Sequence, residues 1–220
     1  MAGVVLVHGA FHGAWCWSPV VEELSRRGVN VEAVELPFTG FSDDVSATRA
    51  AAEAMGPDVV LVGHSYGGMI ISEAAVDVRS VRRLVYVTAF MNDVGEDAAA
   101  ILAGHDGGLA DGIVFTERGA SIAPDAARTF FYGDSGEQSA RQMIARLRPM
   151  RLDALVQKPE PAWKSIPSTY VVCTNDKAIP PDIQRWMAQR ADEVVEVKSD
   201  HSPFVSQKTV LADVIMAHLP

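Results

Sequence analysis

The sequence predicts an α/β protein in which a mostly parallel sheet of six strands is flanked by helices and carries an inserted helical cap. Six short apolar segments, several of them without polar alternation, are typical of parallel strands that are covered on both faces. Segments of helical character lie between them, and this alternation favours an open parallel sheet. A length of 220 residues with 48% hydrophobic residues suffices for one domain with a full core.

The expected elements follow one another along the chain. We expect strands at 4–8, 29–34, 59–63, 84–89, 169–174 and 194–198. The first helix begins at Ser18-Pro19, where serine can cap the helix and proline suits its first position, and it ends at Gly28. Further helices are expected at 45–55, from about Tyr66, at 182–190 and at 207–218. Strand and helix therefore alternate over most of the chain.

The alternation changes between positions 91 and 163. Strand signals fade there, and short helical pieces are expected at 125–131 and 139–147. Loops that follow the carboxyl ends of parallel strands lie where ligands bind in such sheets. We therefore expect residues 1–90 and 164–220 to form the core, and residues 91–163 to form a cap over the carboxyl edge of the sheet.

Composition limits the partners and the compartment. The net charge is −9 with no basic cluster, which argues against a nucleic-acid partner. Cys16 and Cys173 have no zinc-site spacing and are expected to be reduced and buried, and we expect no metal and no cofactor. Neither a signal peptide nor an apolar run of about 18 residues is recognisable, which predicts a cytoplasmic protein without a membrane partner. The sequence leaves the oligomeric state open, a homodimer included.

The most informative segment joins a strand to a helix through a serine. It reads Val59-Val60-Leu61-Val62-Gly63-His64-Ser65-Tyr66-Gly67-Gly68, and an apolar helical stretch follows. A Gly-x-Ser-x-Gly turn in this context lifts the serine hydroxyl to the carboxyl edge of a sheet. Serine is a weak nucleophile at neutral pH, so Ser65 needs a base nearby.

A nucleophilic serine requires an imidazole and a carboxylate that orients it. Of the six histidines, only His201 combines a position in a loop after the last strand with the expected chain order. Two carboxylates follow strand ends in that order, Asp176 and Asp93. Asp176 is favoured because its strand should lie beside the strand that leads to His201, and Asp93 is the alternative.

The remaining site residues are expected around this serine. Backbone N–H groups of Tyr66, which follows the nucleophile, and of Ala10, in the loop after the first strand, would hold an oxyanion. Aromatic residues of that loop and of the cap would line a substrate pocket, although core packing explains them equally well. These pocket candidates are Phe11, His12, Phe131, Tyr132 and Trp163.

Together these segments resemble the α/β-hydrolase superfamily and, within it, the family of plant methyl esterases and hydroxynitrile lyases. The resemblance is that of a bacterial-type member. It depends on six segments, which are Val7-His8-Gly9-Ala10-Phe11-His12-Gly13-Ala14-Trp15-Cys16-Trp17, Gly63-His64-Ser65-Tyr66-Gly67-Gly68, Tyr86-Val87-Thr88-Ala89-Phe90, Val172-Cys173-Thr174-Asn175-Asp176-Lys177-Ala178-Ile179-Pro180, Gln184-Arg185-Trp186 and Asp200-His201-Ser202. It implies a triad of Ser65, Asp176 and His201, with Ala10 and Tyr66 as oxyanion donors. The cap resembles the family only weakly.

Two departures bear on the reaction. The related lyases have threonine and lysine at the positions occupied here by Gly9 and Ser202. Without that lysine, no ammonium group would stabilise a cyanide leaving group. We therefore expect a serine esterase acting on small, mostly apolar carboxylic esters. Hydroxynitrile-lyase-like or other carbonyl chemistry on the same triad is the alternative, and a small-molecule receptor is another.

Overall fold

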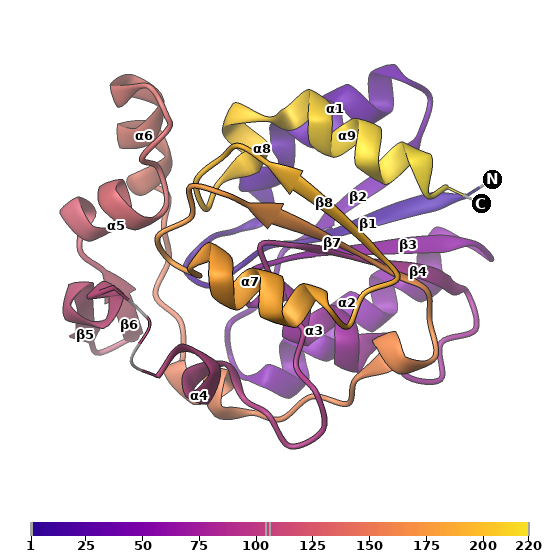
Figure 1. Cartoon of the computed structure of the whole chain (residues 1–220), viewed down its shortest axis with the longest axis horizontal. Helices are drawn as coiled ribbons and strands as arrows, with labels where there is room; N and C mark the ends of the chain where they lie inside the picture. Colours follow the sequence, from indigo (N-terminus) through magenta and orange to yellow (C-terminus); the bar gives the residue numbers. More distant parts are fainter. Residues whose placement is uncertain (1, 104, 106, 220) are drawn as a thin grey trace.

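Six parallel strands form the central sheet of the computed structural model, which describes residues 2–103, 105 and 107–219 (Figure 1). They are β1 (Gly3–Val7), β2 (Asn30–Val34), β3 (Val59–His64), β4 (Val81–Val87), β7 (Ser168–Cys173) and β8 (Glu193–Val197). Their order is β2-β1-β3-β4-β7-β8, and every neighbouring pair is parallel. All six carboxyl ends therefore lie at one edge of the sheet.

Helices cover both faces of this sheet (Figure 1). One face carries α1 (Ser18–Arg26), α8 (Pro203–Ser206) and α9 (Lys208–Ala217), and the other carries α2 (Phe41–Met55), α3 (Gly67–Ala74) and α7 (Pro181–Ala188). The side chains of β1 alternate between two buried clusters, Val4 and Leu6 on the first face, Val5 and Val7 on the second. This burial on both faces explains the uninterrupted apolar runs of the strands.

The six expected strands and the expected core helices are confirmed, with shifts at their ends. Among the strands, the largest shift concerns the fourth, which begins at Val81 and ends at Val87, before the expected residues 88 and 89. Thr88 has a φ of 38°, in the left-handed region that ends an extended strand. The chain therefore turns away from the sheet one residue after β4.

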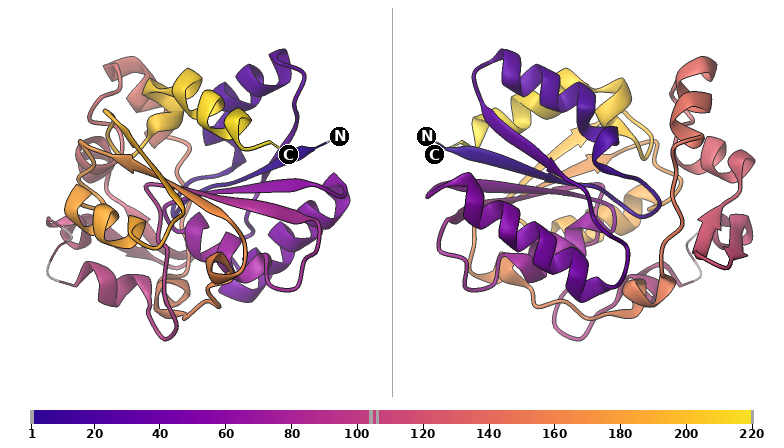
Figure 2. Two further views of the ribbon diagram at one scale, coloured as in Figure 1. Left: turned by 45° about the vertical axis from the view of Figure 1, so that its right-hand side comes forward. Right: turned by 180° about the vertical axis from the view of Figure 1, so that it is seen from behind.

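Residues 91–163 lie beyond the carboxyl edge of the sheet and along its second face (Figures 1 and 2). They form α4 (Ala98–Leu102), η2 (Leu109–Gly112), β5 (Ile113–Thr116), β6 (Gly119–Ile122), α5 (Pro124–Phe130), α6 (Glu137–Ile144), η3 (Leu152–Val156) and η4 (Ala162–Lys164). The antiparallel hairpin β5–β6 corrects the expectation of helical pieces only. Its four-residue strands form a sheet of their own and leave Val114 and Phe115 exposed, so no long apolar run marks them.

No helix within the described ranges has both the length and the apolar character needed to cross a bilayer.

Candidate active site

Ser65 lies on a sharp turn between β3 and α3. Its φ is 53°, a left-handed value that is unfavourable for a residue with a side chain. Its carbonyl accepts hydrogen bonds from the N–H groups of Gly68 at 2.9 Å and Phe90 at 3.1 Å. These bonds hold the strained turn and leave the side chain at the carboxyl edge of the sheet.

The glycines around Ser65 are required by close backbone contacts. A Cβ atom on Gly63 would lie 2.5 Å from the carbonyl oxygen of Gly67, and one on Gly67 would lie 2.6 Å from the carbonyl oxygen of Val7. Carbon and oxygen atoms do not pack at such distances without displacing backbone. The Gly-x-Ser-x-Gly pattern therefore reflects how closely β3, α3 and β1 approach one another.

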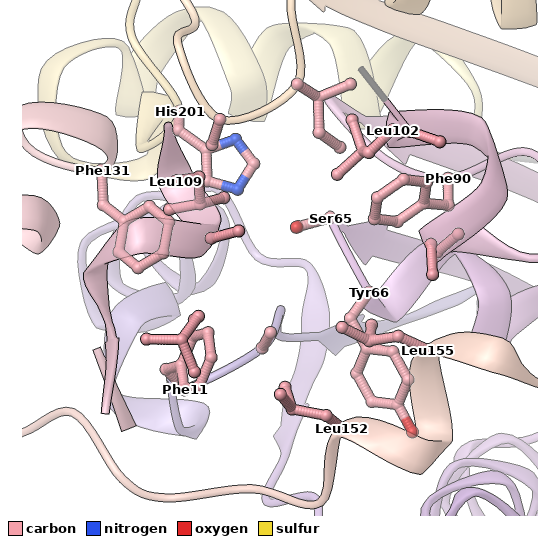
Figure 3. A pocket seen from close by; sticks show the side chains of 18 residues that line it. Phe11, Ser65, Tyr66, Phe90, Leu102, Leu109, Phe131, Leu152, Leu155 and His201 are labelled. Carbon is pink, nitrogen blue, oxygen red and sulfur yellow. The ribbon is translucent and has the colours of Figure 1, made fainter. Parts of the chain in front are cut away.

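His201 follows β8 and is hydrogen-bonded to Asp176, which follows β7. The distance from His201 Nδ1 to Asp176 Oδ2 is 2.7 Å, and both side chains are almost completely buried. A carboxylate only accepts hydrogen bonds, so the proton lies on Nδ1 and the Nε2 atom can act as a base. His201 and Ser65 line the same cavity (Figure 3), and no hydrogen bond joins these two described side chains.

Four further donors hold the Asp176 carboxylate. Oδ1 accepts from the N–H groups of Ala178 at 2.7 Å and Ile179 at 3.1 Å. Oδ2 accepts from Gln184 Nε2 at 3.1 Å and from the hydroxyl of Thr88. Thr88 and Gln184 belong to segments that carry the family resemblance, but the sequence assigned them no role. Nothing in their local sequence indicates that the end of β4 and helix α7 converge on one carboxylate.

Asp93, the alternative acid, is not near this pair. Its carboxylate forms an ion pair with Lys164 at 2.5 Å and is 39% exposed. The hydrogen bond with Lys164 lowers the pKa of Asp93, as expected of a surface ion pair. The structure therefore brings only Asp176 to His201.

The loop that carries His201 is tied to the neighbouring elements. Asp200 Oδ1 accepts a hydrogen bond from Ser202 N at 2.8 Å, and its Oδ2 accepts from Asp134 N at 2.8 Å. His64 Nε2 donates to the carbonyl of His201 at 2.7 Å. Burial holds the pKa of His64 well below its ordinary value, so this ring is neutral. The side chain of Asp200 thus stabilises the loop, and the ring of His64 holds the backbone of His201 through its hydrogen bond.

Two backbone N–H groups border the cavity without a protein acceptor. Neither Ala10 N nor Tyr66 N donates a hydrogen bond to another described residue, and both residues line the cavity that contains Ser65. Phe11, next to Ala10, has a φ of 63°. Ala10 and Tyr66 therefore each carry a backbone N–H group that has no acceptor among the described residues.

The cavity has a volume of about 340 Å³ and an apolar wall. It lies between the carboxyl edge of the sheet and residues 98–113, with η3 closing one side (Figure 3). The Tyr66 hydroxyl donates its proton to Asp44 Oδ2 at 2.8 Å and therefore cannot donate it to a ligand in the cavity. Among the described residues that line the cavity, none carries a charged side chain. Its lining residues are Ala10, Phe11, Ser65, Tyr66, Phe90, Ala98, Ala99, Leu102, Ala103, Leu109, Ala110, Ile113, Phe131, Leu152, Leu155, Ala178, Ile179 and His201.

Two of the five expected pocket residues, Phe11 and Phe131, line this cavity, and three do not. His12 and Tyr132 are buried behind it, where the Tyr132 hydroxyl donates to His12 Nε2 at 2.9 Å. Trp163 donates from Nε1 to the carbonyl of Asn92 at 2.8 Å. Core packing therefore accounts for these three, which corrects the expectation that they line the pocket.

Among the described residues, no group of three or more histidine, cysteine or carboxylate side chains is arranged to hold a metal ion. Cys16 and Cys173 are both buried and unpaired.

Comparison with known proteins gives one family match and many relatives. A family model described as "Alpha/beta hydrolase family" matches residues 4–214. Methylesterase 2 of Arabidopsis thaliana is 28% identical over 97% of this chain and 94% of its own length. Methylesterase 7 of the same plant is 30% identical over 96% of this chain and 94% of its own length.

Solved structures show the same fold. A pyrethroid hydrolase from Sphingobium faniae JZ-2 superposes with a TM-score of 0.85 at 25% identity, covering 99% of this chain and 97% of the other. Tomato methylketone synthase I, solved in complex with 2-tridecanone, superposes with a TM-score of 0.85 at 26% identity over 98% of this chain and 96% of the other.

Proposed function

The chain belongs to the alpha/beta hydrolase family, and from this premise we propose that it is a serine esterase that hydrolyses small, mostly apolar carboxylic esters. The main support is the buried Asp176–His201 pair, whose histidine lines one cavity with a serine on a strained turn. The relatives named methylesterase and pyrethroid hydrolase also favour ester chemistry.

In the proposed reaction, Ser65 Oγ attacks the ester carbonyl carbon while His201 Nε2 takes the hydroxyl proton. Asp176 stays ionised and holds the ring in the tautomer with a proton on Nδ1. The N–H groups of Ala10 and Tyr66 stabilise the oxyanion of the tetrahedral intermediate. His201 then protonates the leaving alcohol. Water, activated by the same histidine, attacks the acyl-enzyme and releases the acid.

The wall of the cavity supports neutral, apolar substrates. A charged group buried there would lose its hydration without gaining a partner, which is strongly unfavourable. The Tyr66 hydroxyl already donates to Asp44, so the wall offers a ligand few donors besides the proposed oxyanion hole. The bound 2-tridecanone of the tomato relative shows that its fold accommodates an unbranched apolar chain.

We assign the role of a cap to residues 91–163, with residues 1–90 and 164–220 as the catalytic core. Eight of the lining residues lie between Ala98 and Phe131, and Leu152 and Leu155 come from η3. This segment would therefore determine which acyl and alcohol groups fit, while the core would supply the chemistry.

The test is hydrolysis of p-nitrophenyl butyrate by the wild-type protein and by Ser65→Ala. We expect wild-type turnover and a loss of about 1,000-fold or more in kcat for the variant, because no other described group would form the acyl-enzyme. Thermal unfolding of both proteins controls for folding. Equal turnover by folded Ser65→Ala would refute the proposal, and so would the absence of turnover on any ester by the wild type.

A further inference from the structure

The loop after β1 is held by hydrogen bonds to three consecutive carbonyl groups. The carbonyl of Ala10 accepts from Nδ1 of His12 at 2.7 Å. The carbonyl of Phe11 accepts from the backbone N–H of Arg148 at 2.7 Å, and the carbonyl of His12 accepts from Arg148 Nε at 3.1 Å. Two of these three donors belong to one residue, 136 positions away from His12 in the sequence.

Arg148 also fixes the neighbouring loop after β2. Its Nη2 atom donates to the carbonyl of Leu36 at 3.0 Å and lies 2.5 Å from a carboxylate oxygen of Glu35. The other oxygen of Glu35 accepts from Ala14 N at 2.9 Å, at the far end of the β1 loop. The guanidinium plane lies over the ring of Phe38, 4.8 Å from its centroid. One side chain thus joins two loops of the core to the segment after α6.

This segment runs from α6 along the edge of the sheet, beside the loop after β1 (Figure 2). Planar guanidinium groups suit such a position, because their donors point in fixed directions and remain charged at all ordinary pH values. Phe11 needs external support, since a left-handed φ in a residue with a side chain persists only where surrounding contacts enforce it.

We infer that Arg148 is a positioning residue for catalysis, which holds the Ala10 amide where the oxyanion forms. The inference rests on the proposed function. Arg148 does not line the cavity, so it acts through the backbone of the β1 loop. An oxyanion donor is effective only when it is already in place as the negative charge develops. Replacing the Arg148 side chain removes its bonds to the carbonyls of His12 and Leu36 and keeps the backbone bond to Phe11. A loop loosened in this way would bind the neutral ester as before but stabilise the transition state less well.

The test compares Arg148→Met and Arg148→Lys with wild type on p-nitrophenyl butyrate. Methionine keeps much of the apolar stem, and lysine keeps the charge without the forked donors. Arg141→Met is the matched control, because Arg141 lies on α6, is 76% exposed and pairs only with Glu137. We expect kcat to fall about 10- to 100-fold in both Arg148 variants, less than the roughly 100- to 1,000-fold of a donor removed outright. We expect KM to change less than threefold and Arg141→Met to match wild type.

Two inhibitors separate positioning from a merely structural role. An alkyl trifluoromethyl ketone is attacked by the serine and forms an oxyanion, whereas the methyl ketone of the same chain length binds without one. We expect the affinity for the fluorinated ketone to fall in parallel with kcat, and the affinity for the methyl ketone to stay within threefold. A guanidinium salt at non-denaturing concentration should restore part of the kcat of Arg148→Met, since the Arg148 side chain is 34% exposed.

Wild-type kcat in Arg148→Met would overturn the inference, and so would full activity in Arg148→Lys, which would indicate that charge alone matters. Equal weakening of both ketones, together with loss of the folded state on thermal unfolding, would also overturn it. A wild-type protein without esterase activity would refute the proposed function itself, whereas these variant results refute only the role of Arg148.

Discussion

Gly9 lies where any side chain would displace the proposed nucleophile. A Cβ atom at this position would be 2.8 Å from Ser65 Cβ and 2.7 Å from His64 Nδ1. Neither neighbour can move freely, because Ser65 occupies a strained turn and His64 donates to the carbonyl of His201. We therefore predict that Gly9→Ala lowers kcat/KM sharply, and that a threonine, as in the related lyases, would fit still less well.

The magnitude follows from the size of this overlap. Carbon atoms pack at roughly 3.5–4.0 Å, so the Cβ pair at 2.8 Å is too close by about 1 Å. Either the β1 loop or Ser65 must shift by about that amount. A displacement of about 1 Å in a reacting group costs about 100-fold in rate, which corresponds to about 2.7 kcal/mol of transition-state stabilisation. We expect a loss of this order in kcat/KM.

The assay is the hydrolysis of p-nitrophenyl butyrate, measured together with thermal unfolding. Gly136→Ala is the matched control, because Gly136 has a φ of −58° and an added Cβ would meet no atom within 4 Å. This control should retain wild-type kcat/KM. Activity of Gly9→Ala within threefold of wild type would show that the site tolerates the overlap, and the assignment of Ser65 to a rigid turn beside this loop would have to be abandoned.

Three further predictions concern the cavity, the buried histidine and the acid. In a series of p-nitrophenyl esters, kcat/KM should rise about fourfold for each methylene added to the acyl chain until the cavity is full, because each buried methylene contributes about 0.8 kcal/mol. A series in which kcat/KM does not change with chain length would contradict an apolar acyl site. Burial lowers the pKa of His12 from 6.5 to about 4. Between pH 4 and pH 6.5, His12 therefore binds a proton in the unfolded chain but not in the folded protein. His12 should therefore contribute a fall of roughly 3 kcal/mol in stability to urea as the pH decreases from 6.5 to 4. The buried His8 and His64, whose pKa values are also lowered, act in the same direction. His12→Gln should reduce the pH dependence by the share of His12, and an unchanged slope would contradict this contribution. Thr88→Val removes a buried hydrogen-bond donor to Asp176 and should lower the free energy of unfolding by about 1.5–3 kcal/mol. Thermal unfolding measures this change, and an unchanged Tm would mean that the hydrogen bond does not stabilise the folded protein.

Local sequence predicted most of the core because its elements have distinct local signals. The strands are apolar runs covered on both faces, and the turn at Ser65 is marked by glycines whose Cβ atoms would strike backbone. The hairpin β5–β6 carried no such signal, since its short strands pair only with each other. Residues 91–163 were therefore predicted least well.

The pocket shows the same limit at the level of single side chains. Phe11 and Phe131 line the cavity, whereas His12 and Tyr132 form a buried hydrogen bond behind it. Both pairs are adjacent in sequence, at positions 11–12 and 131–132. Composition and spacing therefore contain nothing that separates a pocket wall from core packing.

Local signals along the chain predicted the order of strands and helices, the sharp turn at Ser65, and the loops in which an acid and a histidine follow parallel strands. Parallel pairing brings those loops to one edge, which is why chain order could nominate Ser65 and His201 and leave Asp176 and Asp93 as candidates for the acid. The three-dimensional structure was needed to see that Asp176 and not Asp93 reaches the ring. It was also needed to see that Thr88 and Gln184 donate to the same carboxylate, and that Arg148 donates to the loop after β1. Contacts of this kind join segments that are distant in the chain, and they depend on side-chain directions that no local pattern specifies.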